Sequence, residues 1–165
     1  MNESELNRAL VEASCAGGDR PLRAAAVAAV IRRFGSYRWV GLYDVGREQI
    51  SLLGWDGPGP PAHPRFPRGD GLCGAAVTAR RPIVVGDVAE DTRYLTTHTT
   101  TRSEIVVPVI AAGVPVGLID VESEQPEAFG EADERLLQHC AALISPLWRL
   151  AGDDQADAAP GEVLG

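Results

Sequence analysis

Residues 103–123 read SEIVVPVIAAGVPVGLIDVES, and this stretch decides the fold. It holds two apolar runs, 104–111 and 114–123, which are rich in valine and isoleucine and are separated by Ala112 and Gly113. β-Branched residues favour strands, and a two-residue connection that contains glycine favours a tight hairpin. The stretch therefore predicts two neighbouring antiparallel strands.

The rest of the chain predicts helices at both ends and further strands between them. Apolar residues at helical spacing indicate the helices, and short runs of aromatic or β-branched residues indicate the strands. The segment 54–71 is rich in proline and glycine, so it is expected to be a loop with at most a short edge strand near Arg65 and Phe66. The predicted elements are helices at about 4–15, 20–34 and 71–80, strands at 37–43, 49–53 and 83–85, and a last helix from Phe129 to about Leu150.

This order of elements predicts the fold class α+β. An antiparallel sheet would carry the terminal helices on one face, and the loops and the short helix on the other. The chain has 165 residues, 45% of them hydrophobic, which suits one domain with a single core. We expect this domain to span residues 1–152. Residues 153–165 have no apolar periodicity and are expected to form a disordered tail.

The composition argues against several classes of partner. The net charge of −8 does not suit binding to the phosphates of nucleic acid or to an anionic membrane surface. No run approaches the roughly 18 apolar residues of a membrane span, and the charged N-terminal segment does not read as a signal peptide. A cytoplasmic location is therefore expected, in which all cysteines would be reduced.

Four stretches carry a resemblance to a known family. They are Trp39–Tyr43 (WVGLY), Gly69–Gly74 (GDGLCG), Ser103–Pro108 (SEIVVP) and Gly117–Ser123 (GLIDVES). In their order and spacing, with helices at both ends of a sheet, the chain resembles the GAF domains. More specifically, it resembles the free methionine-(R)-sulfoxide reductases, which are small single-domain GAF proteins. The resemblance runs from about residue 5 to residue 150 and implies a GAF fold with a ligand pocket under the loops.

The resemblance also implies which residues form this small closed pocket for free methionine sulfoxide. Trp39 and Tyr43 match its aromatic wall, and Glu104 and Asp120 match its carboxylates. Glu122 stands where the family usually has a second aspartate, so the charge is kept on a side chain that is one methylene longer. These five residues are the pocket that the resemblance predicts.

The redox cysteines of the family are only partly kept. Cys73 matches one of them, but the position of the catalytic cysteine falls, within one residue, on Thr97, and that of its partner falls near His63. Sulfoxide reduction by this route needs a thiolate to attack sulfur and a second thiol to resolve the adduct, so the standard mechanism is expected to be lost. Cys73 lies either near a helix N-terminus whose dipole lowers its pKa, or in the core as a small buried residue. Cys15 and Cys140 are expected to be structural residues on apolar helix faces.

The pattern of residues also points to a cluster of carboxylates. Asp120 and Glu122 alternate on one strand and therefore share a face, and Glu104 stands at the head of the neighbouring strand, where a solvated strand end is the alternative. Unpaired carboxylates that converge in a buried place are costly, so the cluster predicts a cationic group in the ligand, such as an amino group. Thr97 and His98 in the preceding loop are expected to hydrogen-bond this ligand. No cofactor is predicted, and no metal site either, because too few ligands are evident.

Three functions are compatible with these features. The first, which we prefer, is a stand-alone GAF domain that binds a small amine-bearing metabolite, such as methionine or its sulfoxide, as a sensor or binding module with a lost reductase centre. The second is a free methionine-(R)-sulfoxide reductase with an altered mechanism that relies on Cys73 and an external thiol. The third is an interaction module with a vestigial pocket, which forms a homodimer through its amphipathic terminal helices.

Overall fold

A computed structural model describes residues 2–149 of the chain. The tail predicted at 153–165 lies outside these residues. The helices are α1 (Glu3–Cys15), α2 (Arg20–Gly35), α3 (Gly71–Ala79) and α4 (Glu131–Ile144), with two short 3-10 helices, η1 (Val88–Glu90) and η2 (Ser145–Trp148). The strands are β1 (Trp39–Val45), β2 (Gln49–Asp56), β3 (Arg65–Pro67), β4 (Ile83–Val85), β5 (Ser103–Ala111) and β6 (Val114–Ser123).

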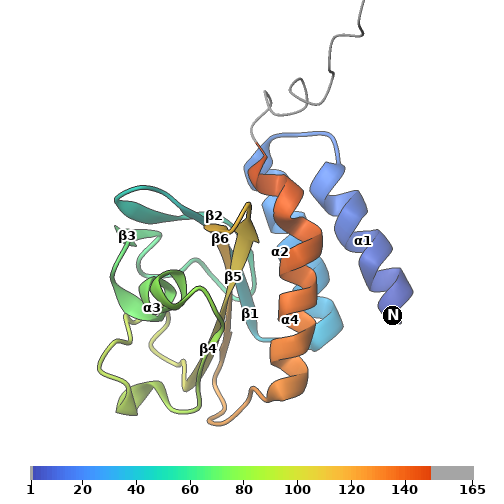
Figure 1. The fold of residues 1–165 in the computed structure, drawn as a ribbon. Coiled ribbons are helices and arrows are strands. Elements are labelled where there is room, and N and C mark those ends of the chain that lie inside the picture. The colour runs from blue at the N-terminus through green and yellow to red at the C-terminus, as the bar shows by residue number, and fades with distance from the viewer. Residues whose placement is uncertain (1, 150–165) are drawn as a thin grey trace, which may run out of the picture.

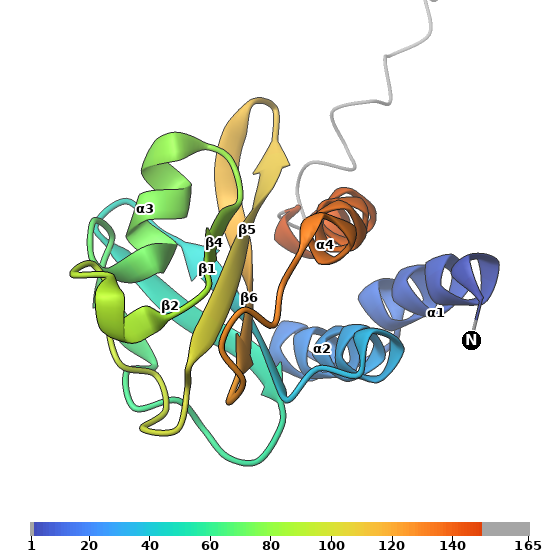
Figure 2. The same cartoon turned by 90° about the horizontal axis from the view of Figure 1, so that it is seen from below.

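The six strands form one antiparallel sheet in the order β3-β2-β1-β6-β5-β4. The predicted hairpin is present as β5 and β6, with Ala112 and Gly113 in its turn, both at positive φ. Figure 1 and Figure 2 show α2 and α4 against one face of the sheet with α1 packed outside them, and α3 with the long loops on the other face. The predicted α+β architecture, with the terminal helices on one face, is confirmed.

The ends of the helices follow local sequence signals. Asn2 caps α1 and Asp19 caps α2, because each side chain accepts a backbone N–H of the first turn. The last helix is shorter than expected, since α4 ends at Ile144 rather than near Leu150. Pro146 explains the difference, because it has no N–H to continue the helical ladder, and the chain proceeds as the 3-10 helix η2.

Alternation along the strands divides the buried residues into two cores. On the helix face, Val40 and Leu42 of β1 pack with apolar residues of the helices. On the opposite face, Trp39 and Tyr43 of the same strand pack with α3, including Leu72. The first core holds the helices on the sheet, and the second forms the floor of the candidate site.

The apolar stripe of the first helix is used inside the chain. Leu6 and Leu10 of α1 are completely buried in the helix-face core. Val11 and Leu22 remain as exposed apolar residues of the N-terminal helices, and the homodimer expected from these helices stays a prediction. Within residues 2–149, no helix combines the length and the apolar character that crossing a membrane requires.

Candidate functional site

Three carboxylates lie buried next to one another on the face of the sheet that carries α3. Glu104 of β5 stands directly opposite Glu122 of β6, and Asp120 lies two residues before Glu122. Their exposed fractions are only 3% for Glu104, 1% for Asp120 and 2% for Glu122. One oxygen of each, namely Glu104 Oε2, Asp120 Oδ1 and Glu122 Oε1, has no hydrogen-bond partner among the described residues. The structure thus brings together the carboxylates that strand alternation places on one face, and Glu104 is not a solvated strand end.

Burial raises the pKa of both Glu104 and Asp120 well above the ordinary range of carboxyl groups. Charge repulsion raises both pKa values further. The charges of Asp120 and Glu122 disfavour ionisation of Glu104, and the charge of Glu122 disfavours ionisation of Asp120. A hydrogen bond between Glu104 and Asp120 raises the pKa of Glu104 and opposes the rise in the pKa of Asp120, so the two carboxyls titrate as a pair. The site therefore favours an added positive charge, which can be a proton or a bound cation.

Trp39 and Tyr43 form an aromatic wall beside the carboxylates, and each is only 1% exposed. Gly41 between them makes this arrangement possible, because a Cβ there would lie 2.3 Å from Cη2 of Trp39 and 3.0 Å from Cε2 of Tyr43. Gly41 is the register partner of Asp120 on β6, so the two rings flank that carboxylate. The indole Nε1 of Trp39 donates to the carbonyl of Gly59 at 3.0 Å, which ties the wall to the loop above it.

Cys73 faces the carboxylates from the first turn of α3. Its Sγ and one carboxylate oxygen each from Glu104 and Asp120 all lie within 4.8 Å of one another. Gly74 in the same turn lets the preceding segment pack closely on the helix, because a Cβ there would lie only 2.4 Å from the carbonyl carbon of Gly69. The thiol is thus part of the carboxylate cluster and not merely a neighbour of it.

The environment of Cys73 keeps its thiol neutral. Burial raises its pKa well above the ordinary value, and the negative charges of Asp120, Glu104 and Glu122 raise it further. Of the two alternatives that the sequence left open, the buried position is the one found, and any lowering of the pKa by the dipole of α3 is outweighed by burial and three carboxylates. Cys73 in this state is a poor nucleophile.

The other two cysteines lie outside the site. Cys140 is buried in the helix-face core, as expected, and burial raises its pKa to about 12. Cys15 is exposed, which corrects the prediction of a structural position. It is the last residue of α1, where the inward position is taken by Ser14, whose hydroxyl donates to the carbonyl of Leu10 at 2.7 Å.

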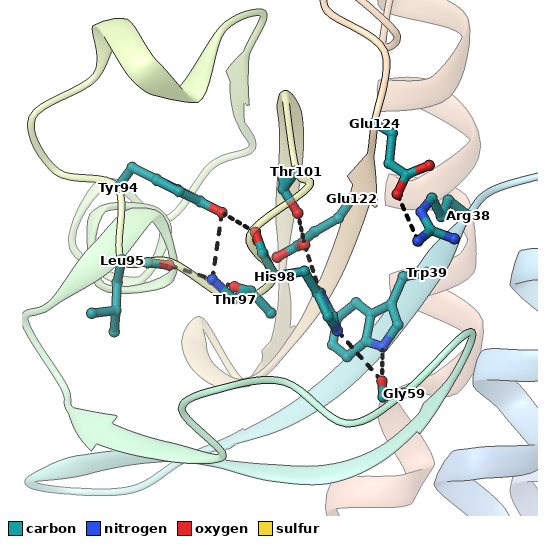
Figure 3. A network of polar contacts seen from close by, with 10 residues as sticks. All are labelled: Arg38, Trp39, Gly59, Tyr94, Leu95, Thr97, His98, Thr101, Glu122 and Glu124. Atoms are coloured by element: carbon teal, nitrogen blue, oxygen red, sulfur yellow. Dashed lines mark hydrogen bonds and ion pairs between the residues drawn. The ribbon is translucent and has the colours of Figure 1, made fainter.

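Two loops cover the carboxylates, and together they form what we call the lid (Figure 3). Ala62 of one loop donates its backbone N–H to the carbonyl of Thr97 in the other at 2.8 Å. The contacts of Tyr94 are longer, because its hydroxyl lies 3.4 Å from the nitrogen of Thr97 and 3.5 Å from the carbonyl of His98. One good hydrogen bond thus joins the two loops, whereas the long contacts of Tyr94 lie within the second loop. The lid comprises residues 58–64 and 94–101.

His98 connects the lid to Glu122. Its Nδ1 lies 3.0 Å from Oε2 of Glu122, and its Nε2 lies 3.4 Å from the carbonyl of Gly59. Both partners are hydrogen-bond acceptors, so a ring nitrogen that carries a hydrogen can donate to the partner beside it. Thr101 donates its hydroxyl to the same oxygen of Glu122, and the imidazole packs edge-on against Trp39 with ring centroids 5.1 Å apart (Figure 3). Glu122 thus has a partner that can carry positive charge, whereas no described ion pair satisfies the other two carboxylates.

The space beside the carboxylates is divided into two small chambers, each with a volume of about 10 Å³. A site needs roughly 10–15 Å³ by such a measure to hold one water molecule, so each chamber admits about one water-sized occupant. The cysteine chamber is lined by residues that include Tyr43, His63, Cys73, Thr97, Glu104 and Asp120. The histidine chamber is lined by residues that include Trp39, His98, Thr101 and Glu122.

The positions that the resemblance assigns to the missing cysteines are neighbours in space. His63 and Thr97 both line the cysteine chamber together with Cys73. The three positions are therefore grouped as redox partners would be, yet an imidazole and a hydroxyl cannot form a disulfide with the one thiol. Both side chains can hydrogen-bond, and the imidazole of His63 can also bind a cation.

All predicted pocket residues lie around the two chambers, but sequence reasoning missed three neighbours. Thr101 bonds Glu122, yet nothing distinguished it from the other threonines in 96–101. Tyr94 stands at the base of the lid in a loop without any periodic pattern. Gly41 did carry a signal, because a glycine between two aromatic residues inside a strand often marks a close approach.

Comparisons with known proteins agree with this architecture. A family profile described as GAF domain matches residues 23–148. The GAF domain-containing protein A of Dictyostelium discoideum is 32% identical over 118 residues, which cover 72% of this chain and 74% of that protein. The free methionine-R-sulfoxide reductase of Saccharomyces cerevisiae is 32% identical over 110 residues, which cover 65% of this chain and 61% of the yeast protein.

A solved structure extends the likeness to the fold. The free methionine-R-sulfoxide reductase from Neisseria meningitidis, determined in complex with its substrate, superposes with a TM-score of 0.78 at 29% identity. The superposition covers 88% of this chain and 87% of the Neisseria chain. The predicted GAF fold is confirmed, and with homologues named free methionine-R-sulfoxide reductase among its relatives, this chain belongs to the GAF domain family.

Proposed function

We propose that this GAF domain binds a small amine-bearing metabolite of the amino-acid class in the site under the lid. The observation that carries the proposal is the pair Glu104 and Asp120, each almost completely buried and each with one oxygen that has no partner among residues 2–149. A protonated amino group has three donors and one positive charge, so it would satisfy these oxygens and relieve the repulsion between the carboxylates.

The walls of the site suit the rest of such a ligand. Trp39 and Tyr43 offer aromatic surface, which attracts cations and also packs against an apolar side chain. Thr97 and His98 of the lid supply polar groups that could orient a carboxylate or a sulfoxide oxygen. Because the Neisseria relative is named for methionine sulfoxide and was solved with its substrate, methionine and methionine sulfoxide are the first candidates for the ligand.

Binding would require the lid to move. Each chamber admits about one water-sized occupant, which is far smaller than an amino acid. The segment 94–101 is the part that we expect to open, because its histidine contacts the carbonyl of Gly59 in the other loop only at 3.4 Å. The ligand would then take the space between the two chambers, and the domain would act as a sensor or binding module.

A thermal-shift titration with a panel of amino acids tests the proposal. The panel contains methionine and both epimers of methionine sulfoxide, and we expect at least one member to raise the melting temperature in a concentration-dependent way. The Asp120→Asn variant should lose this stabilisation, whereas Glu131→Gln, which changes a carboxylate that is 91% exposed, should keep it. Absence of stabilisation by every member of the panel would contradict the proposal.

A second candidate is reduction of free methionine-(R)-sulfoxide, because Cys73 lines the chamber and relatives carry that activity in their names. The thiol would attack the sulfoxide sulfur, so that methionine leaves and Cys73 becomes a sulfenic acid. An external thiol would then form a mixed disulfide with release of water, and a second external thiol would restore Cys73. Such a cycle suits a reducing compartment, in line with the predicted cytoplasmic location.

Turnover with dithiothreitol and the Cys73→Ser variant separates this candidate from simple binding. The reductase requires production of methionine by the parent chain and its loss in the variant. The raised pKa of the Cys73 thiol leads us to expect little or no turnover. Binding that persists in a catalytically silent parent would favour the binding module.

A homodimer through the terminal helices is a further proposal for the same chain. The exposed side chains of Val11 and Leu22, at 48% and 66%, are the apolar groups that such a contact would cover. Sedimentation at high micromolar concentration tests it, and a monomer under these conditions would contradict it.

A further inference from the structure

We propose that Cys73, Glu104 and Asp120 form a binding site for a divalent first-row transition-metal ion, such as Zn²⁺. The three side chains come from α3, β5 and β6, and all three are buried. The ion would use the same oxygens of Glu104 and Asp120 as the proposed amino group, so the two ligands would compete, and only the ion would also bind the thiol of Cys73.

The spacing of the donor atoms fits one ion. Zinc binds thiolate, carboxylate and imidazole ligands at about 2.0–2.3 Å in tetrahedral geometry, so two ligands of the same ion lie about 3.3–3.8 Å apart. The Sγ of Cys73 and the oxygens of Glu104 and Asp120 lie within 4.8 Å of one another, so side-chain adjustments of up to about 1 Å close the site. The cysteine chamber between them has a volume of about 10 Å³, which suits a single ion while the lid is closed.

The buried oxygens give independent evidence that something is bound. Glu104 Oε2 and Asp120 Oδ1 are buried acceptors without a hydrogen-bond partner among residues 2–149. Buried acceptors are normally satisfied, and two neighbouring carboxylates in this state are unfavourable without a cation. A divalent ion would offset their charge and would also convert the adjacent thiol of Cys73 to a thiolate.

The chemistry of the donors selects the class of ion. A thiolate is a soft ligand, which Mg²⁺ and Ca²⁺ do not use, whereas Zn²⁺, Fe²⁺ and Co²⁺ accept thiolate together with carboxylate and imidazole. His63 lines the same chamber and is the residue available as a fourth ligand from the lid. The metal was not expected from the sequence, because its ligands lie 31 and 16 residues apart along the chain (73 to 104, and 104 to 120) and meet only in the fold.

Cobalt spectroscopy of the full chain tests the site directly. The protein is treated with a chelator, dialysed and titrated with Co²⁺, and we expect a near-ultraviolet thiolate-to-cobalt charge-transfer band that saturates at one ion per chain. Cys73→Ser should lose the band. Cys140→Ser is the matched control, because it removes the other buried thiol and leaves the site intact, and Cys15→Ser removes the exposed thiol.

A second variant keeps the test decisive if Cys73→Ser does not fold. Asp120→Asn retains the thiol, so the band should persist at saturation while the affinity for Co²⁺ falls by at least the roughly 10–100-fold that loss of an outer-shell partner costs. No band in the parent chain would overturn the proposal. So would a band that disappears in Cys15→Ser but survives in Cys73→Ser, or an affinity that Asp120→Asn leaves unchanged.

Discussion

The two faces of the hairpin formed by β5 and β6 are built from the same strands and have opposite chemistry. On the helix face, Ile105 and Ile119 are fully buried in an apolar core. On the other face, the alternating positions hold Glu104, Asp120 and Glu122, which are buried to a similar degree. The helix face stabilises the fold, whereas the pocket face carries groups that the chain alone does not satisfy. Burial at equal depth therefore accompanies apolar packing on one face and the proposed binding site on the other.

The two buried cysteines repeat this contrast. Cys140 lies among apolar residues of the helix face, where burial alone raises its pKa. Cys73 lies on the pocket face, where the neighbouring carboxylates add to the effect of burial. A thiol among carboxylates can become a ligand when a cation arrives, whereas a thiol among apolar side chains remains inert.

The largest effect is expected from a truncation on the helix face. Ile119→Ala removes a fully buried side chain at a position paired with Val107 and Leu42, so it should lower the free energy of unfolding by about 2–5 kcal/mol. Ligand or metal affinity of the folded fraction should not change. Urea denaturation measures the loss. A loss below about 1 kcal/mol would contradict the claim that the helix face stabilises the fold.

The opposite sign is expected on the pocket face. Glu104→Gln removes a buried charge and supplies an amide that can donate to Asp120, so the ligand-free chain should become more stable by about 1–3 kcal/mol near neutral pH. Ligand binding should weaken at the same time. Glu131→Gln at the surface is the control and should change stability by less than about 0.5 kcal/mol. Destabilisation by Glu104→Gln would remove the distinction between the two faces.

The pH dependence sharpens the same contrast. The carboxyls of Glu104 and Asp120 have a higher pKa in the folded chain than in the unfolded chain. At a pH between the unfolded-state pKa and the folded-state pKa, the folded chain therefore binds more protons than the unfolded chain. The contribution of these two carboxyls to stability is therefore greatest at low pH, and it is lost as the pH rises through their folded-state pKa values. Relative to a Glu104→Gln, Asp120→Asn double variant, the ligand-free parent should lose about 1 kcal/mol or more between about pH 5 and pH 8. Thermal unfolding across this range measures it, and parallel curves for the two proteins would contradict the account.

The smallest effect on stability is expected at the lid. His98 is 21% exposed, and its contact with Glu122 is partly screened by solvent, so His98→Ala should change the free energy of unfolding by about 1 kcal/mol or less. Hydrogen exchange of residues 94–101 should nevertheless become faster, because the variant lacks the link to Glu122. Unchanged exchange in this segment would show that His98 does not hold the lid.

The fold could be predicted from the sequence where local signals agree with the final structure. The hairpin at 103–123 combines β-branched runs with a two-residue turn, and the terminal helices combine apolar stripes with caps at Asn2 and Asp19. The expectation failed where one residue overrides a pattern. Pro146 ends α4 although the apolar spacing continues beyond it.

The candidate site was predictable only as far as the strands define it. Alternation placed Asp120 and Glu122 on one face, but their burial depends on the lid, which has no periodic pattern. The state of Cys73 depends on burial and on carboxylates that are distant in sequence, so its place near a helix N-terminus could not decide the direction of its pKa shift. The place of Thr101 in the site is evident only from its hydrogen bond with Glu122, which the sequence does not indicate.

A calorimetric comparison of two ligands tests the central claim most directly. L-Methionine sulfoxide and its deaminated analogue share the sulfoxide and the carboxylate and differ only in the amino group. We predict that the amino acid binds and that the analogue loses about tenfold or more in affinity, because hydrogen bonds between charged groups contribute about 1.5–3 kcal/mol. The difference should vanish in the Glu104→Gln, Asp120→Asn double variant. Equal affinity of the parent chain for both compounds, or binding of neither, would contradict the claim that these buried carboxylates recognise a cationic group.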